Sequence, residues 1–163
     1  RKESSAASDV YKRQDKYPVF LNKYSESKLV NPYYFIDELG KALKNNQVIV
    51  SADGTACVTA FQGLKIKKGQ RLYTNSGCAS MGYDLPAAIG AWQHNKEEII
   101  CIAGDGSIMM NIQELTTIVK NKMNIKIFLF NNDGYHSIRQ TQNNFFNRQV
   151  GCGPDSNLFF PNI

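Results

Sequence analysis

The sequence predicts an α/β fold in which helices cover both faces of an open parallel sheet. Short apolar runs of strand length alternate with segments of helical periodicity along the 163 residues, an order typical of parallel sheets. Polar turns rich in glycine, aspartate and asparagine follow three of these runs, and open α/β sheets bind ligands at such strand ends. An apolar content of 42% suffices for one domain with a hydrophobic core.

The first predicted helix runs from Asn31 to Lys44. Asn31 is a preferred N-cap residue, and Pro32 occupies the first helical position, where a missing N–H does no harm. A short buried strand is expected at 48–50. The polar turn after it leads into a second helix that begins near Ala56.

For the middle of the chain the sequence predicts a strand, a helix and another strand. The strand at 71–74 follows a basic turn that we interpret as a solvated loop. Pro86 lies in the first turn of the next helix, where its missing N–H is again harmless. The run Ile-Ile-Cys-Ile-Ala at 99–103 has the β-branched content of a buried parallel strand.

A long helix and a fourth buried strand are expected next. Ser107 is the predicted N-cap of a helix that ends at Lys122, and the strand covers 125–130. A helix of this length rises about 24 Å and the strand about 20 Å, so the chain returns to the sheet edge that it left. Residues 135–146 are predicted to form a loop or a short helix. The apolar face of the long helix consists of Ile108, Ile112, Leu115, Ile118 and Val119.

Asp105 and Asn132 are expected to lie side by side and to bind a metal ion. The motif GDG closes the strand at 99–103, and NN closes the strand at 125–130. Mg²⁺ prefers oxygen ligands and shares its octahedron between protein and phosphate. Asp105 would supply a carboxylate, Asn132 an amide oxygen and Gly134 a backbone carbonyl. The alternative is that these residues only form turns, in which glycine, aspartate and asparagine are common.

The GDG turn also predicts a diphosphate site beside the metal. Gly106 has no side chain and would let the backbone approach a phosphate. The amides of Gly106 and Ser107 open the predicted helix, whose positive end favours an anion. Neither GxGxxG nor GxxxxGK[ST] occurs, so the fingerprints of dinucleotide and nucleoside-triphosphate sites are missing.

The motifs of this region carry a resemblance to a known family. The order GDGS, NIQEL and NNDGY, with TNSGCASMGYDLPAAIGA before it, resembles the signature of thiamine-diphosphate enzymes. Within them it is similar to the acetolactate synthase large-subunit group, from about Val30 to about Ser156. The fold implied is the thiamine-diphosphate-binding fold, and the cofactors implied are thiamine diphosphate and Mg²⁺.

The resemblance also implies a role for each site residue. The residues implied to hold Mg²⁺ are Asp105, Asn132 and, through its carbonyl, Gly134. Those implied to hold the diphosphate are Gly106, Ser107, Gly54 and Thr55, although the turn at Gly54 could be an ordinary one. In the family a bulky apolar side chain, here Met81, wedges between the two cofactor rings. A carbonyl two residues earlier, here Ala79, orients the 4′-amino group. Met81 could instead fill the core, the commonest use of methionine.

Departures from the family pattern bear on the substrate. Pyruvate-decarboxylase-like relatives carry a glutamate six residues beyond the metal-binding asparagine, where this chain has Ile138. We therefore expect ligation rather than release of a simple aldehyde. Asp84 replaces a residue that is commonly glycine. His136 could contact substrate or phosphate or be a solvated group, and Arg139 and Arg148 are expected to be solvated helix residues rather than carboxylate receptors.

The resemblance implies that the full-length protein decarboxylates a 2-oxo acid, with pyruvate expected, and ligates the pyruvate-derived carbanion to a second carbonyl compound. The acceptor could be another 2-oxo acid, as in acetolactate synthase, or a keto-sugar nucleotide. In the family an activating glutamate comes from another domain on a neighbouring subunit, so this chain alone is expected to be inactive. From a different class, it could be a non-catalytic cofactor-binding fragment.

The same reasoning divides the chain. Residues 31–163 are expected to form the thiamine-diphosphate/Mg-binding domain, truncated at the C-terminus. The N-terminal domains and a second subunit of a homo-oligomer would then be missing. Residues 17–30 are interpreted as a connector. Residues 1–16 are polar and without periodicity, which predicts a flexible or foreign segment.

Composition gives little support to nucleic-acid or membrane partners. The net charge of +5 comes largely from residues 1–30, which hold seven basic and four acidic residues, and no basic stripe with aromatic residues occurs. No apolar run approaches 18 residues, and no signal-peptide pattern is present. The four cysteines lack CxxC spacing, which favours a reducing cytoplasm over a zinc site or a disulfide framework.

Overall fold

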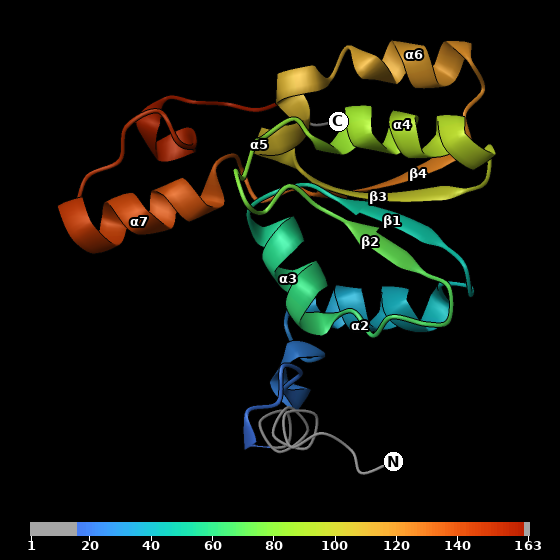
Figure 1. The fold of residues 1–163 in the computed structure, drawn as a ribbon. Coiled ribbons are helices and arrows are strands. Elements are labelled where there is room, and N and C mark those ends of the chain that lie inside the picture. Colours follow the sequence, from blue (N-terminus) through green and yellow to red (C-terminus); the bar gives the residue numbers. More distant parts are fainter. Residues whose placement is uncertain (1–15, 162–163) are drawn as a thin grey trace.

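A four-stranded parallel sheet forms the centre of the computed structural model, which describes residues 16–161 (Figure 1). The strands are β1 (Val48–Ser51), β2 (Arg71–Tyr73), β3 (Ile99–Gly104) and β4 (Ile125–Phe130). They lie in the order β2-β1-β3-β4, and every neighbouring pair is parallel. The α/β parallel-sheet prediction is confirmed. The predicted flexible or foreign segment 1–16 lies outside the described residues except for Lys16.

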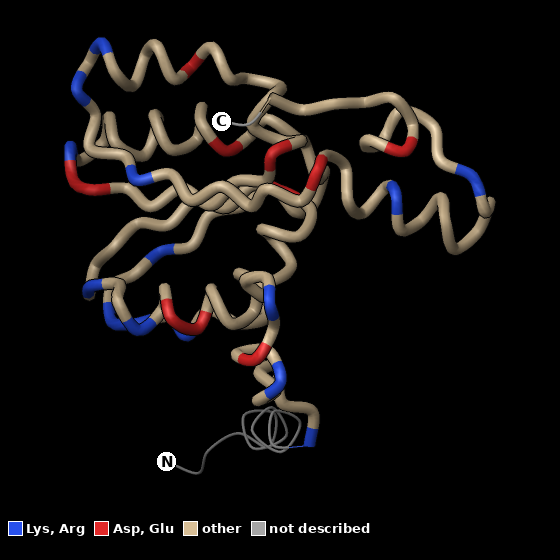
Figure 2. Tube along the Cα trace, turned by 180° about the vertical axis from the view of Figure 1, so that it is seen from behind, with Lys and Arg blue, Asp and Glu red and all other residues tan. Residues whose placement is uncertain are grey.

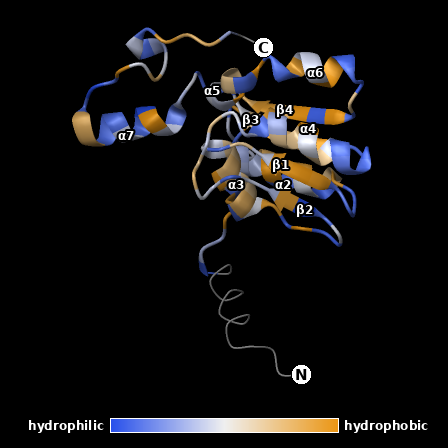
Figure 3. Cartoon of the chain, turned by 45° about the horizontal axis from the view of Figure 1, so that its top comes forward, coloured by the Kyte–Doolittle hydropathy of each residue, from blue (hydrophilic) through white to orange (hydrophobic). Residues whose placement is uncertain are grey.

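Helices cover both faces of this sheet (Figure 1). On one face lie α2 (Pro32–Ala42) and α3 (Thr55–Gly63); on the other lie α4 (Asp84–Asn95) and α6 (Glu114–Lys120). The predicted cap of α2 is present, because the Asn31 side chain accepts a 2.9 Å hydrogen bond from Tyr33 N. Figure 3 shows hydrophobic residues concentrated along the strands and hydrophilic ones at the loops.

β3 is the centre of the core because it has a strand on each side and helices on both faces. Residues 99–103 are no more than 2% exposed. Ile102 pairs with Ser51 of β1 and with Phe128 of β4, and Gly104 pairs with Phe130. The turns that follow β3 and β4 therefore begin at the same level of the sheet.

β4 differs from the prediction that it is a fully buried strand. It forms an edge of the described sheet, and its residues are half-buried or exposed. Lys126 is exposed and forms a 2.7 Å ion pair with Glu98. The apolar composition of 125–130 could not reveal this position, since composition does not say how many neighbours a strand has.

The predicted continuous helix from Ser107 to Lys122 is wrong. The segment is divided into α5 (Asp105–Ile108), the 3-10 turn η2 (Met109–Asn111) and α6. The backbone at Ile112 stays right-handed, with φ −58° and ψ −28°, so tighter hydrogen bonding rather than a reversal divides it. Hydrophobic periodicity does not register such a change. Ser107 lies within α5 and is not its N-cap.

The C-terminal part forms a separate helix, α7 (His136–Phe146). The predicted loop or short helix at 135–146 is thus an 11-residue helix, which extends away from the sheet and has no buried residue (Figure 1). Two more 3-10 turns, η1 (Asn22–Tyr24) and η3 (Pro154–Ser156), flank the domain. No helix in residues 16–161 is both long and apolar enough to cross a membrane.

We expect Ile102→Ala to destabilise the fold by about 2–5 kcal/mol, because Ile102 is fully buried in β3 and the truncation leaves a cavity. The free energy of unfolding in urea measures this loss. Val119→Ala is the control, since Val119 is 75% exposed. Equal stability of the two variants would contradict the central place of β3 in the core.

Candidate functional site

The predicted site residues come together at the carboxyl ends of β1, β3 and β4. One cavity there is lined by Gly54, Thr55, Met81, Asp105, Gly106, Ser107, Asn132 and Gly134. Of the predicted set, Ala79 is not among the lining residues. Figure 2 shows several acidic residues close together at this end of the sheet.

The Asp105 carboxylate organises the loop that follows β4. Its Oδ2 accepts hydrogen bonds from the backbone N–H groups of Gly134 (2.8 Å) and Asn132 (3.2 Å), and its Oδ1 accepts one from Gly106 N (2.8 Å). Asp105 is 3% exposed. Asp133 and Gly134 have φ values of 61° and 106°, so two successive left-handed residues wrap the loop around this carboxylate.

The Asn132 side-chain amide lies beside two oxygen atoms, one from Gly134 and one from Asp105. One terminal atom of its amide lies 2.8 Å from the Gly134 carbonyl oxygen and 3.2 Å from Asp105 Oδ1. With nitrogen in this place, the amide donates to both oxygens. With oxygen there, three oxygens converge, and a cation can satisfy them. Adjacent ligands of an octahedral Mg²⁺ with bonds of 2.0–2.1 Å are about 2.9 Å apart, which fits the distances found.

Gly106 is required by a contact that the sequence did not reveal. A Cβ at this position would lie 2.6 Å from Tyr135 Cδ1, so the tyrosine ring occupies the space of a side chain. The ring of Tyr135 in turn packs edge-on against Phe160, with centroids 5.2 Å apart. The glycine therefore permits close packing of the loop after β4 onto α5.

The Ser107 hydroxyl is already engaged within the protein. It donates a 2.6 Å hydrogen bond to Asp84 Oδ2 and accepts one of 3.0 Å from Gly82 N. Ser107 is 5% exposed. Because a hydroxyl has a single proton, it cannot also donate to a phosphate in this arrangement. Any contact of Ser107 with a diphosphate would come from its backbone amide.

The turn from β1 into α3 approaches the first turn of α7. Gly54 has φ 65° and ψ −136°, a conformation that suits glycine. A Cβ on Gly54 would lie 3.7 Å from Ser137 Oγ. Thr55 is the first residue of α3, and no side chain caps this helix. The amides at the start of α3 thus face the cavity with their hydrogen-bonding capacity open to a ligand.

Met81 lies on the turn between β2 and α4. It is 42% exposed and lines the cavity. Ala79 has φ 50° and donates its N–H to the Asn75 carbonyl over 2.7 Å. A half-exposed methionine at a cavity wall argues against the alternative that Met81 only fills the core.

The first turn of α7 forms another wall, with His136, Ser137 and Ile138 as lining residues. The expectation that Arg139 is a solvated helix residue is wrong. Its Nη2 donates to the Asn132 carbonyl over 2.5 Å, and its Nη1 donates to the Asp133 carbonyl. Arg139 thereby ties α7 to the loop after β4.

Two buried acids near the cavity were not predicted as site residues. Asp53 is 7% exposed, and neither of its carboxylate oxygens has a hydrogen-bond partner among the described residues. Asp84 is fully buried and accepts from Ser107 Oγ and, over 2.8 Å, from Leu85 N. The signal for Asp53 was its place between a buried strand and Gly54; for Asp84 it was the departure from glycine.

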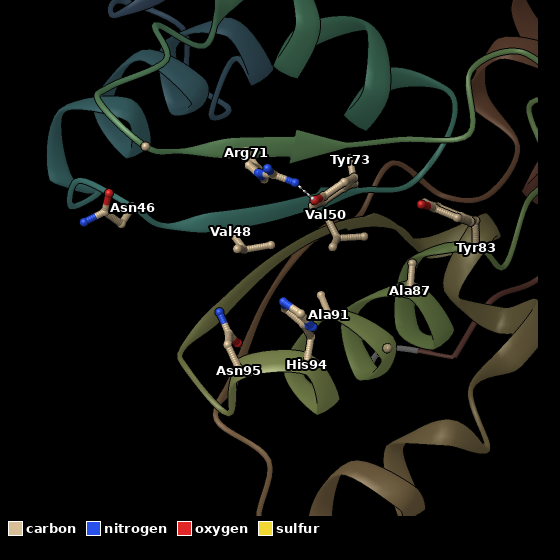
Figure 4. A pocket seen from close by; sticks show the side chains of 12 residues that line it. Asn46, Val48, Val50, Arg71, Tyr73, Tyr83, Ala87, Ala91, His94 and Asn95 are labelled. Carbon is tan, nitrogen blue, oxygen red and sulfur yellow. Dashed lines mark hydrogen bonds between the residues drawn. The ribbon is translucent and has the colours of Figure 1, made fainter.

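A larger cavity, of about 750 Å³, lies elsewhere, between the β1–β2 side of the sheet and α4 (Figure 4). Val48, Val50, Ala87 and Ala91 form its apolar wall. Arg71 there donates to the Tyr73 hydroxyl over 3.0 Å. The carboxylates of Asp53 and Asp105 and the predicted glycine-containing turns line the smaller cavity at the strand ends instead, so we assign the functional site to it.

Comparison with known proteins identifies the class of domain. Residues 53–162 match the model of the family described as "Thiamine pyrophosphate enzyme, C-terminal TPP binding domain", and the chain belongs to this family. Membership of this family implies that the cofactor is thiamine diphosphate together with Mg²⁺. The match confirms the resemblance and the fold that were inferred from the motifs.

Several similar curated proteins are acetolactate synthases. The chain is 38% identical to the large subunit from Cyanidium caldarium (86% of the chain, 23% of the relative). It is 33% identical to acetolactate synthase 3, chloroplastic, from Brassica napus (96% and 24%) and 34% identical to the isozyme 1 large subunit from Escherichia coli K12 (72% and 21%). The chain thus spans less than a quarter of the length of these relatives.

We expect Asp53→Asn to stabilise the cofactor-free fold at neutral pH. Burial raises the pKa of the Asp53 carboxyl above its usual value, and the charge of Asp84 adds to this. The unfolded chain therefore releases the proton at lower pH than the folded chain. Stability is lost as the pH rises from the unfolded pKa of about 3.9 through the higher pKa of the folded chain. An unpaired buried polar group costs about 1–3 kcal/mol.

Calorimetric melting at pH 4 and pH 7.5 measures this effect. The melting temperature of Asp53→Asn should exceed that of the wild type at pH 7.5, and the difference should shrink at pH 4. Asp155→Asn, which removes an exposed acid, is the matched control. A lower melting temperature of Asp53→Asn at pH 7.5 would show that Asp53 has a stabilising partner.

Proposed function

We propose that this chain is the metal- and diphosphate-binding domain of a thiamine-diphosphate-dependent carboligase. In the whole protein it would act on a 2-oxo acid, with pyruvate as the donor, and join the product of decarboxylation to a second carbonyl compound. The observation that carries the proposal is the convergence of the Asp105 carboxylate, the Asn132 side-chain amide and the Gly134 carbonyl at the strand ends. The similarity to acetolactate synthases supports it.

Asp105, the Asn132 amide oxygen and the Gly134 carbonyl would hold Mg²⁺. The diphosphate would be bound by the backbone amides of Gly54, Thr55, Gly106 and Ser107. Thiamine diphosphate, when bound, supplies the electron sink for decarboxylation. The Met81 side chain would hold the cofactor rings in their bent shape, and the Ala79 carbonyl would orient the 4′-amino group.

Neither a lysine nor an arginine lines the described cavity, whereas Asp53 and Asp105 do. A diphosphate brought to these carboxylates without a cation would be repelled. A metal ion held by the acidic loop would offset this repulsion, and affinity for the cofactor should depend steeply on Mg²⁺. A glutamate from another domain, on a neighbouring subunit of an oligomer, would activate the pyrimidine ring of the cofactor. This chain alone would then be inactive.

The first turn of α7 would contact the reacting carbonyl compounds. Ile138 lines the cavity at the position that holds a glutamate in pyruvate-decarboxylase-like relatives. Without a proton-donating carboxylate there, capture by a second carbonyl competes well with protonation to an aldehyde. His136 and Ser137 offer polar contacts to the acceptor, which would be a second 2-oxo acid. A keto-sugar nucleotide is the second candidate, because this turn departs from the usual acetolactate synthase sequence.

We expect Asp105→Asn in the full-length protein to weaken Mg²⁺-dependent binding of thiamine diphosphate about 100-fold or more, roughly 3 kcal/mol. The asparagine keeps one acceptor oxygen for the loop amides but removes the charge that faces the cation. Asn132→Ala should act in the same direction more weakly. Calorimetric titration with cofactor and Mg²⁺ measures both, and unchanged affinity in both variants would reject the metal assignment.

Met81→Ala should lower turnover more than cofactor affinity, because the metal and the diphosphate contacts supply most of the anchoring. We expect kcat to fall about tenfold or more, whereas the Kd for thiamine diphosphate changes little. Met81→Leu, which keeps a bulky apolar side chain, is the matched control. Equal losses of affinity and turnover in Met81→Ala would mean that Met81 is not a wedge.

Product analysis of the full-length protein distinguishes the acceptors. With pyruvate alone, acetolactate should accumulate if the acceptor is a second 2-oxo acid. Condensation only when a keto-sugar nucleotide is added would favour the second candidate. Release of acetaldehyde as the main product would contradict ligation by this site.

A further inference from the structure

The turn that carries Met81 has little regular structure of its own. It joins β2 to α4, and two of its residues, Ala79 (φ 50°) and Gly82 (φ 83°), have left-handed backbones. Such a conformation is unfavourable for a residue other than glycine. The position of Met81 therefore depends on contacts that other elements make with this turn.

Gly82, the residue after Met81, is held at both of its backbone polar groups. Its N–H donates a 3.0 Å hydrogen bond to Ser107 Oγ in α5. Its carbonyl accepts a 2.7 Å hydrogen bond from the Asn111 side-chain amide in η2. A Cβ on Gly82 would lie 2.7 Å from Met110 Cβ. The turn is thus pressed closely against the segment that follows β3.

Asp84 decides which way the Ser107 hydroxyl points. Asp84 is fully buried, and its Oδ2 accepts the hydroxyl proton over 2.6 Å. With its only proton given to Asp84, Ser107 Oγ must present a lone pair, and Gly82 N–H is the donor that it receives. Without an acceptor at position 84, the hydroxyl could rotate and donate elsewhere, and the Gly82 N–H would lose a fixed partner.

Burial of Asp84 is costly. Removing a carboxylate from water is unfavourable, and no lysine or arginine pairs with Asp84 in the ion pairs of residues 16–161. Its hydrogen bonds come from Ser107 and from Leu85 N. Asp84 thus lacks an ion pair among the described residues, and its interactions are these two hydrogen bonds.

We propose that Asp84 is a positioning residue, which acts through the Ser107 hydroxyl and Gly82 N–H to hold Met81 at a fixed place in the cofactor cavity. The proposal rests on the proposed function, in which Met81 shapes the bound cofactor. Asn111 supports the same turn from its carbonyl side. Asp84 itself does not line the cavity, so its effect on a ligand is transmitted by the turn.

The side chain and the backbone amide of Ser107 therefore have different roles. Its side chain belongs to the Met81 turn, and its backbone amide is left for the diphosphate. Ser107→Ala should therefore disturb Met81 without removing the amide. This separates the positioning role from a direct contact between the serine hydroxyl and phosphate.

Methionine methyl NMR tests the proposal without reliance on activity. The full-length protein is labelled with [methyl-¹³C]methionine, and the signals of Met81 and Met123 are assigned with Met81→Leu and Met123→Leu. Met123 is 8% exposed and reports on the core. In Asp84→Ala and Ser107→Ala, the Met81 signal should shift and broaden, whereas that of Met123 should stay in place. Asp84→Asn, which keeps an acceptor oxygen, should restore the wild-type Met81 signal.

Glu97→Ala, which removes an exposed acid beyond the far end of α4, is the control and should leave both signals unchanged. An unchanged Met81 signal in Asp84→Ala and Ser107→Ala would overturn the proposal. An Asp84→Asn signal that matches that of Asp84→Ala would also overturn the proposal, because the charge of Asp84 would then be what matters. A shift of the Met123 signal in both Asp84→Ala and Ser107→Ala would do the same, because the two residues would then act on overall stability.

Kinetics of the loaded enzyme add a second readout. In Asp84→Ala, kcat should fall about tenfold or more, as in Met81→Ala, while the Kd for thiamine diphosphate stays within about threefold. A Met81→Ala variant with full turnover would reject the wedge role in the proposed function. The methyl signal would still show whether Asp84 positions Met81, so the two failures are distinguishable.

Discussion

The site depends on the hydrogen bonds that the Asp105 carboxylate accepts. An ionised carboxylate has about four directions in which it can accept hydrogen bonds, and three backbone amides, from Gly106, Asn132 and Gly134, occupy three of them. These bonds join the turn after β3 to the loop after β4 and fix the shape of that loop. The remaining capacity is on Oδ1, which lies 3.2 Å from a terminal atom of the Asn132 amide.

The charge balance of the cavity follows from the same arrangement. Asp53 and Asp105 line it, Asp84 lies buried beside it, and basic side chains among the described residues stay outside it. An anionic cofactor can bind here because backbone amides supply partial positive charge and a divalent ion supplies the rest. The acidic character seen in Figure 2 is therefore consistent with a diphosphate site that depends on its metal.

The turn after β3 serves two parts of the site at once. Asp105 fixes the loop of the metal residues, and two positions later the Ser107 hydroxyl binds the Met81 turn and Asp84. α5 is only four residues long and is followed by a 3-10 turn, which brings Asn111 to the Gly82 carbonyl. The break in the helix thus allows one short segment to hold both the metal loop and the Met81 turn.

The sequence by itself determined the parallel α/β sheet, the N-cap of α2 and the meeting of Asp105 with Asn132, because period, caps and strand-end motifs are local signals. Only the tertiary structure decided that 107–122 is a broken helix, that β4 lies at an edge and that Arg139 holds the loop after β4. The same holds for the engagement of the Ser107 hydroxyl with Asp84 and for the unpaired carboxyl of Asp53. These features arise from contacts between segments far apart in the sequence, which no local pattern encodes.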